Sequence, residues 1–187
     1  MSLDTFVVLA NQYSTEADAL ADYDAVRTLY SDLAVIDTYD AAVLTRKADG
    51  EVEIVKRVEE PTRHGAVAGL VLGLAVGAVV ALFPAAGVPL AASMFGGGAL
   101  GTIVGAVAGH VARGMKRSDL KHLGELLNSG TSGLVVVAAS DLETKIEAVI
   151  TKAKKRAKAQ LQADVDAMKK EIESLSAQEV EEVVASK

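Results

Sequence analysis

The stretch that decides the fold lies in the middle of the chain, where residues 65–112 read GAVAGLVLGLAVGAVVALFPAAGVPLAASMFGGGALGTIVGAVAGHVA. These 48 residues contain no Asp, Glu, Lys or Arg. Residues 65–83 and 90–112 are each about long enough to cross a membrane, because a hydrocarbon core needs roughly 20 helical residues. The stretch therefore predicts two apolar helices joined by a short turn.

Glycine recurs at every fourth position in both halves of this stretch. The two ladders are Gly65, Gly69, Gly73, Gly77 and Gly97, Gly101, Gly105, Gly109. A spacing of four places each ladder on one face of a helix. Glycine disfavours helix in water, but a bilayer enforces helix, and small residues then let two helices approach closely. We interpret the stretch as a membrane-inserted hairpin closed by a double glycine zipper, with these glycines at the helix-packing and oligomerisation contacts.

The turn and the two open ends of the hairpin have different compositions. Pro84, Gly87 and Pro89 stop one helix and start the next. Basic residues flank the open ends, where we expect them to contact lipid headgroups: Arg63, His64, Arg113, Lys116 and Arg117. Under the positive-inside rule both ends stay on the cytoplasmic side. The N-terminus also lacks the pattern of a signal peptide. We therefore expect both termini in the cytoplasm.

The flanking sequence predicts an α+β domain. Its expected elements, in order, are a strand over 5–11, a helix capped by Ser14 or Thr15, strands over 39–46 and 51–58, a helix from Ser118, and a strand over 133–139. The order β-α-β-β-α-β is the ferredoxin-like split βαβ pattern. We therefore predict a ferredoxin-like sheet interrupted by the hairpin.

The predicted parts are residues 1–62 and 118–140 for the ferredoxin-like domain, 63–117 for the hairpin and 141–187 for a C-terminal amphipathic helical tail. In the tail a heptad-like seam is formed by Leu161, Val165, Met168, Ile172 and Leu175. A basic cluster precedes it: Lys152, Lys154, Lys155, Arg156 and Lys158. The helix could pack on its own domain, pair with another subunit or contact a membrane surface.

Composition excludes several functions. The 25 acidic and 19 basic side chains leave a net charge of −6. An acidic body argues against nucleic acid as the main partner, because phosphate binding needs a basic face. The chain has no cysteine. Disulfides, Cys-ligated zinc and thiol nucleophiles are therefore excluded.

No catalytic, metal or cofactor site is visible in the sequence. Gly96, Gly98 and Gly101 match the dinucleotide-binding spacing G-x-G-x-x-G, but no βαβ unit surrounds them. His64 and His110 could be neighbours at the open end of the hairpin, although no carboxylate accompanies them in the sequence. The acidic residues of the first helix are expected in solvent: Asp18, Asp22 and Asp24. We predict a protein that is not an enzyme and has no cofactor.

A ferredoxin-like element order with an inserted double-GxxxG hairpin resembles the bacterial domain-of-unknown-function family twelve sixty-nine. More loosely, it is similar to general-stress proteins with a glycine-zipper insertion. The resemblance covers residues from about 3 to 150. It implies a bacterial inner-membrane protein with a possible role in stress physiology, and it brings no catalytic residues.

The first functional hypothesis is a non-enzymatic membrane-associated protein that assembles with itself, its hairpin inserted in lipid to scaffold or remodel the membrane. The partners are then the lipid bilayer and further copies of the chain. The alternatives are a soluble homo-oligomer or shell whose hairpins pack on each other, and a ferredoxin-like sensor of a small ligand.

Overall fold

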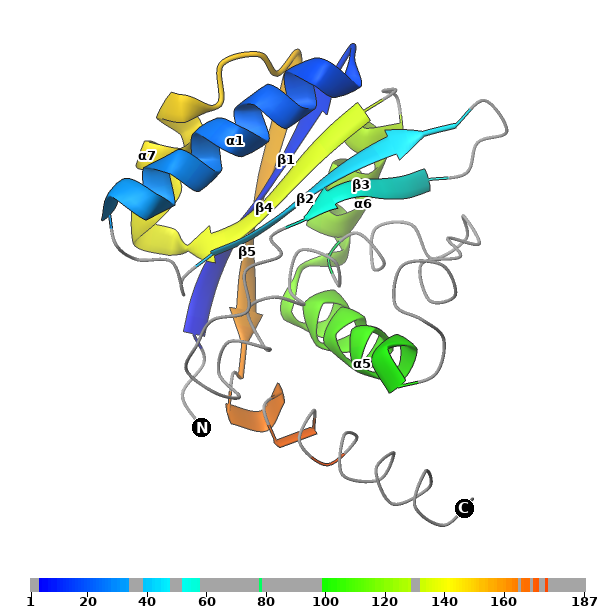
Figure 1. Cartoon of the computed structure of the whole chain (residues 1–187). Helices are drawn as coiled ribbons and strands as arrows, with labels where there is room; N and C mark the ends of the chain where they lie inside the picture. Colours follow the sequence, from blue (N-terminus) through cyan, green and yellow to red (C-terminus); the bar gives the residue numbers. More distant parts are fainter. Residues whose placement is uncertain are drawn as a thin grey trace, which may run out of the picture.

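A computed structural model describes residues 4–33, 39–47, 52–57, 78, 99–128 and 132–164, with shorter pieces at 166–168, 170–171 and 174. Its helices and strands are β1 (Asp4–Tyr13), α1 (Glu16–Leu33), β2 (Tyr39–Arg46), β3 (Val52–Arg57), α5 (Ala99–Gly114), α6 (Arg117–Asn128), β4 (Ser132–Ala139), a 3-10 turn (Ser140–Leu142), α7 (Glu143–Val149) and β5 (Lys155–Ala163) (Figure 1).

The five strands form one antiparallel sheet in the order β3-β2-β4-β1-β5. Helices α1 and α7 cover one face, and α5 and α6 lie on the other (Figure 1). Alternation along β1 produces these two cores, because successive side chains of a strand point to opposite faces. Val7 and Leu9 pack toward α1, whereas Val8 and Ala10 pack toward α6. The described part of the chain is therefore a three-layer sandwich.

Helix α1 begins and packs as its sequence predicts. The hydroxyl oxygen of Thr15 accepts a hydrogen bond from the Asp18 backbone N–H at 3.2 Å, so Thr15 supplies the N-terminal cap. The buried residues Ala19, Tyr23, Val26 and Tyr30 follow helical spacing and form the stripe that faces the sheet. The predicted strands over 39–46 and 133–139 also appear within one residue of their expected bounds, and the helix expected from Ser118 begins at Arg117.

The α+β class is confirmed, but the predicted third strand, over 51–58, does not take the central position that the ferredoxin-like pattern gives it. That pattern places the third strand between the first two and both helices on one face. Here β4 lies between β1 and β2, while β3 is at an edge of the sheet. β4 takes the central position by pairing with both β1 and β2, and β5 occupies the outer side of β1 that a ferredoxin-like fold gives to its fourth strand.

The prediction of one long helix over 141–187 is wrong for residues 155–163. Helix α7 ends at Val149, and the chain continues as β5, paired with β1 from Asp4↔Ala163 to Gln12↔Lys155. The burial of β5 alternates strictly, with Ala157, Ala159, Leu161 and Ala163 turned inward. Pairing with β1 and burial of this apolar side outweigh the helix propensity of Ala and Lys. Leu161 is therefore a sheet residue and does not belong to a heptad seam.

The end of α5 touches β5 more closely than a side chain would allow. A Cβ atom on Gly114 would lie 2.1 Å from the backbone carbonyl oxygen of Gln162 and 2.8 Å from Cδ1 of Leu161. No real Cβ contact is that short, and a backbone atom cannot move aside at little cost. The absence of a side chain at position 114 thus sets the distance between the helix and the strand.

We expect Gly114→Ala to destabilise the fold by about 1–3 kcal/mol, the usual range for overpacking. Gly109→Ala in the same helix is the matched control, because its Cβ would meet only the flexible end of Arg113, at 3.4 Å. That change should leave stability equal or raise it by up to about 1 kcal/mol, since Ala favours helix over Gly. Urea unfolding of both variants measures the difference. Equal stability of the two would contradict the packing argument.

Candidate functional site: the cleft along strand β5

Many of the predicted site residues fall outside the described part of the chain. They are Gly65, Gly69, Gly73, Gly77 and Gly97 of the ladders, the turn residues Pro84, Gly87 and Pro89, and Arg63 and His64 at the entry to the hairpin. The zipper, the turn and the entry contacts therefore stay predictions.

Helix α5 contains the remaining ladder positions Gly101, Gly105 and Gly109. Its last two turns lie against the sheet, where Val107 and Val111 are 1% and 0% exposed within the same core as β1, β5 and α6. The end of the predicted second hairpin helix is thus part of the protein core. Among the described residues, no helix combines the length and the apolar character that crossing a membrane requires.

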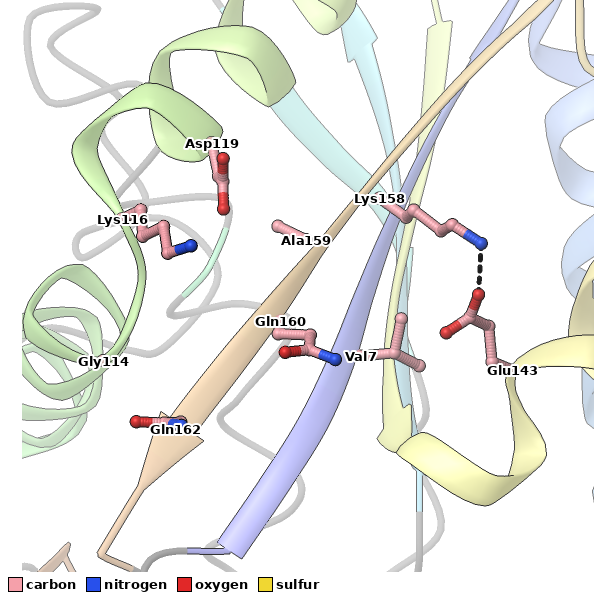
Figure 2. A pocket seen from close by; sticks show the side chains of 9 residues that line it. All are labelled: Val7, Gly114, Lys116, Asp119, Glu143, Lys158, Ala159, Gln160 and Gln162. Carbon is pink, nitrogen blue, oxygen red and sulfur yellow. Dashed lines mark hydrogen bonds and ion pairs between the residues drawn. The ribbon is translucent and has the colours of Figure 1, made fainter.

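The three exit cations, Arg113, Lys116 and Arg117, are exposed. They lie at the end of α5 and the start of α6, where the chain passes from the uncharged stretch into the sandwich. Lys116 also faces a cleft beside β5 (Figure 2). The structure places these cations together at one corner of the described fold, and their contact with lipid headgroups stays a prediction.

This cleft has a volume of about 490 Å³ and runs along β5. Its floor includes Val7 of β1 with Ala159, Gln160 and Gln162 of β5 (Figure 2). One wall is the α5–α6 connection, with Gly114, Lys116 and Asp119, and the other side holds Glu143 and Lys158. A second hollow of about 360 Å³ shares Lys158 and is lined by Leu9, Asn11, His122, Glu147, Arg156 and Ala157. Together the two hollows follow β5 from residue 156 to residue 162.

Two of the three basic side chains of β5, Arg156 and Lys158, are bound at α7. The Lys158 ammonium donates to the Glu143 carboxylate (Figure 2). It also lies 3.4 Å from Glu147 Oε1. The hydrogen bond to Glu143 raises the pKa of Lys158, and the charge of Glu147 adds to the shift. The Arg156 guanidinium donates to the backbone carbonyls of Glu147 and Ile150. Both cations are consequently bound to groups of α7 and its C-terminal end.

The cleft offers binding groups and no visible catalytic machinery. Its polar lining is two lysines, two carboxylates and two amides, without a paired nucleophile and base. Within the residues that the structure describes, no group of three or more His, Asp or Glu side chains could hold a metal ion. The arrangement suits polar and backbone contacts with a partner.

One of the histidines, His110, has a partner that the sequence did not reveal. His110 Nε2 lies 2.6 Å from Glu171 Oε2, so α5 is linked to the segment that follows β5. The expectation that no carboxylate accompanies His110 is therefore wrong. No local pattern could have predicted this, because 61 residues separate the pair. His122 is exposed on α6 and lines the smaller hollow.

Asp22 is buried, contrary to the prediction that the carboxylates of the first helix lie in solvent. Only 1% of Asp22 is exposed. One carboxylate oxygen accepts hydrogen bonds from the Tyr13 hydroxyl at 3.0 Å and the Lys152 backbone N–H at 2.9 Å, and the other accepts from the Thr151 backbone N–H at 3.2 Å. These bonds join β1, α1 and the α7–β5 connection. A signal did exist, since Asp22 lies within the apolar stripe of α1 between Ala19 and Tyr23.

We expect Asp22→Asn to lower the free energy of unfolding by roughly 2–3 kcal/mol, because an amide nitrogen would replace an oxygen that accepts from buried donors. Asp24→Asn is the matched control, since Asp24 is exposed on the same helix. It should change stability by less than about 0.5 kcal/mol. Chemical denaturation of both variants tests the difference. If the two variants are equally stable, the buried carboxylate does not hold the junction.

Three tyrosines are protected from ionisation in the fold. Burial raises the pKa of Tyr13, with the Asp22 carboxylate as the next cause, and burial also raises the pKa of Tyr23 and of Tyr30, with Tyr39 next. Tyr30 stacks on Tyr39 with ring centroids 3.6 Å apart. None of these phenols is suited to act as a base near neutral pH, because each is held in its protonated form.

These shifts predict loss of stability in alkali. At a pH above about 10 the unfolded chain releases phenolic protons that the folded chain keeps. The stabilisation is complete below that pH and falls as pH rises, because the native state then binds more protons. Unfolding free energies at increasing pH, with phenolate absorbance, measure this. Tyr30→Phe is the control variant, because among the described residues its hydroxyl has no hydrogen-bond partner. It should keep neutral stability and show a shallower decline, and an unchanged slope would exclude Tyr30 as a contributor.

Comparison with known protein families, curated proteins and solved structures finds no match to this chain. The resemblance to family twelve sixty-nine therefore stays a prediction, and the function has to be argued from the residues.

Proposed function

We propose that this chain is a non-enzymatic, membrane-associated assembly protein. Its α/β/α sandwich is held at a lipid bilayer by the uncharged segment of residues 65–106, and copies of the chain assemble there. The bacterial inner membrane, with both termini on the cytoplasmic side, is the location that the resemblance and the positive-inside rule favour. Scaffolding or remodelling of the membrane, as part of a stress response, is the physiological role that we propose.

The observation that supports this proposal is the uncharged segment, followed directly by cations. A soluble domain has little reason to contain 48 consecutive residues without an acidic or basic side chain. A bilayer tolerates such a sequence well, because charged side chains near its centre cost about 2.5–3.5 kcal/mol each. Arg113, Lys116 and Arg117 follow at once and are exposed. They suit contact with anionic headgroups, where each basic residue contributes about 1 kcal/mol.

The packing of α5 narrows how the segment could insert. Val107 and Val111 of the second limb and Ala78 of the first limb belong to the same core cluster, so only parts of the segment remain for insertion, with residues 90–106 left for the second helix of the hairpin. About 17 residues is the lower limit for a helix that crosses a bilayer. We therefore expect an insertion that ends close to the sandwich, with the exit cations at the lipid surface.

The same packing favours one alternative, a soluble assembly in which the apolar segments of several copies bury one another. Helix α5 already shows that part of the predicted hairpin can be covered by protein, since Ala108 and Met115 are also buried. In that case the glycine ladders would pack protein against protein without lipid.

Fractionation of the full chain expressed in bacteria distinguishes the two. Under the membrane proposal the protein stays in the pellet after an alkaline carbonate wash and needs detergent for release. A soluble, uniform large particle would exclude the membrane proposal and favour the alternative. Gly73→Leu combined with Gly105→Leu should reduce assembly in either case, because leucine fills the stripe that lets helices approach.

Neutralising the exit cations tests the proposed lipid contact. We expect Arg113→Ala, Lys116→Ala and Arg117→Ala together to weaken sedimentation with vesicles containing anionic lipid by roughly 100-fold, at about 1 kcal/mol per cation. The matched control removes three cations elsewhere, at Lys56, Lys145 and Lys154, and should have a much smaller effect. Equal losses in the two triple variants would mean that only net charge matters and that the exit corner is not the contact.

A further inference from the structure

The outer edge of β5 is an open strand edge in the described structure. β5 is the last strand of the sheet, and β1 is its only neighbour among the described strands. An antiparallel edge strand presents N–H and C=O groups on its free side, where they can pair with another strand. With Lys155–Ala163, β5 is nine residues long, which is long for such an edge.

The opposite edge of the sheet, formed by β3, is less regular than the edge formed by β5. The described part of β3 is Val52–Arg57, and its pairing with β2 shifts register between Val43 and Leu44. Short strands and bulges are the usual devices that prevent pairing at an edge. β5 pairs with β1 through nine consecutive residues without a register shift and contains no proline. Of the two edges of the described sheet, the regular one at β5 is the better suited to accept a further strand.

Lysine on an edge strand usually prevents pairing, but Arg156 and Lys158 of β5 are bound to α7. Lys158 is bound by Glu143 and Glu147, and Arg156 donates to backbone carbonyls at α7. All of these contacts lie on the α7 face of the sheet. The two hollows described above leave room beside β5, between α7 and the α5–α6 connection (Figure 2).

The charges around this groove favour a partner with the same edge. Its cations are Lys116, Arg156 and Lys158, and its carboxylates are Asp119, Glu143 and Glu147. The formal charges cancel, so the groove does not select a strongly acidic or basic peptide. A second β5, flanked by the same balanced set, meets this requirement.

We propose that two copies of the chain pair through residues 157–161 of β5, antiparallel and about a two-fold axis, so that their sheets become continuous. The pairing is centred on Ala159, which places Lys158 opposite Gln160 of the other copy. Centring it on Lys158 would place two lysines directly opposite each other, which is unfavourable. It ends at Leu161, because Gly114 lies against the carbonyl of Gln162. Isologous contacts of this kind are the commonest basis of homodimers.

This inference goes beyond the proposed function, because it does not require the segment 65–106 to enter lipid. It also concerns a surface distinct from the glycine ladders. The chain has no cysteine, so one introduced thiol reports on a single position.

The test is cross-linking of the full chain in intact bacterial cells with a short, membrane-permeable bis-maleimide. Gln160→Cys should form a covalent dimer, since the two positions are diagonal neighbours about 7–8 Å apart. Glu53→Cys, exposed on β3 at the other edge, is the matched control and should form far less. A cross-link of Gln160→Cys to a different protein, equal yields at the two positions, or no dimer at position 160 would each overturn the proposal. Because the assay works in the membrane or the cytosol, it does not depend on the fractionation result.

A charge variant tests the register. Gln160→Lys would face Lys158 twice in the dimer, and we expect self-association in sedimentation experiments to weaken roughly tenfold. Gln160→Ala removes the amide without adding charge and should weaken it much less. Both variants should keep the fold, because Gln160 is exposed. Equal dissociation constants for the lysine and alanine variants would overturn the proposed pairing.

Discussion

The pairing of β1 on both of its edges is the constraint on which the rest of the sandwich depends. β1 comes from the start of the chain, and its partners β4 and β5 come from beyond residue 131. Its two faces are also covered, by α1 and α7 on one side and by α5 and α6 on the other. A buried strand needs all of its backbone groups satisfied. Residues 1–62 consequently form no independent unit, and the apolar segment is an insertion whose two ends must return to the same sheet.

Polar contacts decide how the last part of the chain is placed on this sheet. Asp22 ties α1 to the start of the connection that leads into β5. Arg156 and Lys158 then tie β5 back to α7. Burying a carboxylate is unfavourable unless its oxygens accept hydrogen bonds, and the oxygens of Asp22 accept three. These bonds have directional requirements that apolar packing lacks, so they select one arrangement of α7 and β5.

The contact between α5 and β5 connects the two proposals. Val111 lies in the core, and Gly114 brings the helix onto the backbone of β5. The helix that ends the apolar segment is therefore in direct contact with β5, the strand proposed to pair with a second copy.

Local periodicity in the sequence determined much of the secondary structure and the α+β class. The run of residues 5–11, the stripe of α1 and the run at 133–139 form the elements that their patterns predict, because alternation and helical spacing are properties of neighbouring residues. The uncharged stretch of residues 65–112 and the cations that follow it are also evident from the sequence alone. Only the tertiary structure decided the strand order, the strand at 155–163, the burial of Asp22 and the pairing of His110 with Glu171. Each of these depends on a partner distant in sequence, and the energy of such contacts outweighs local propensity.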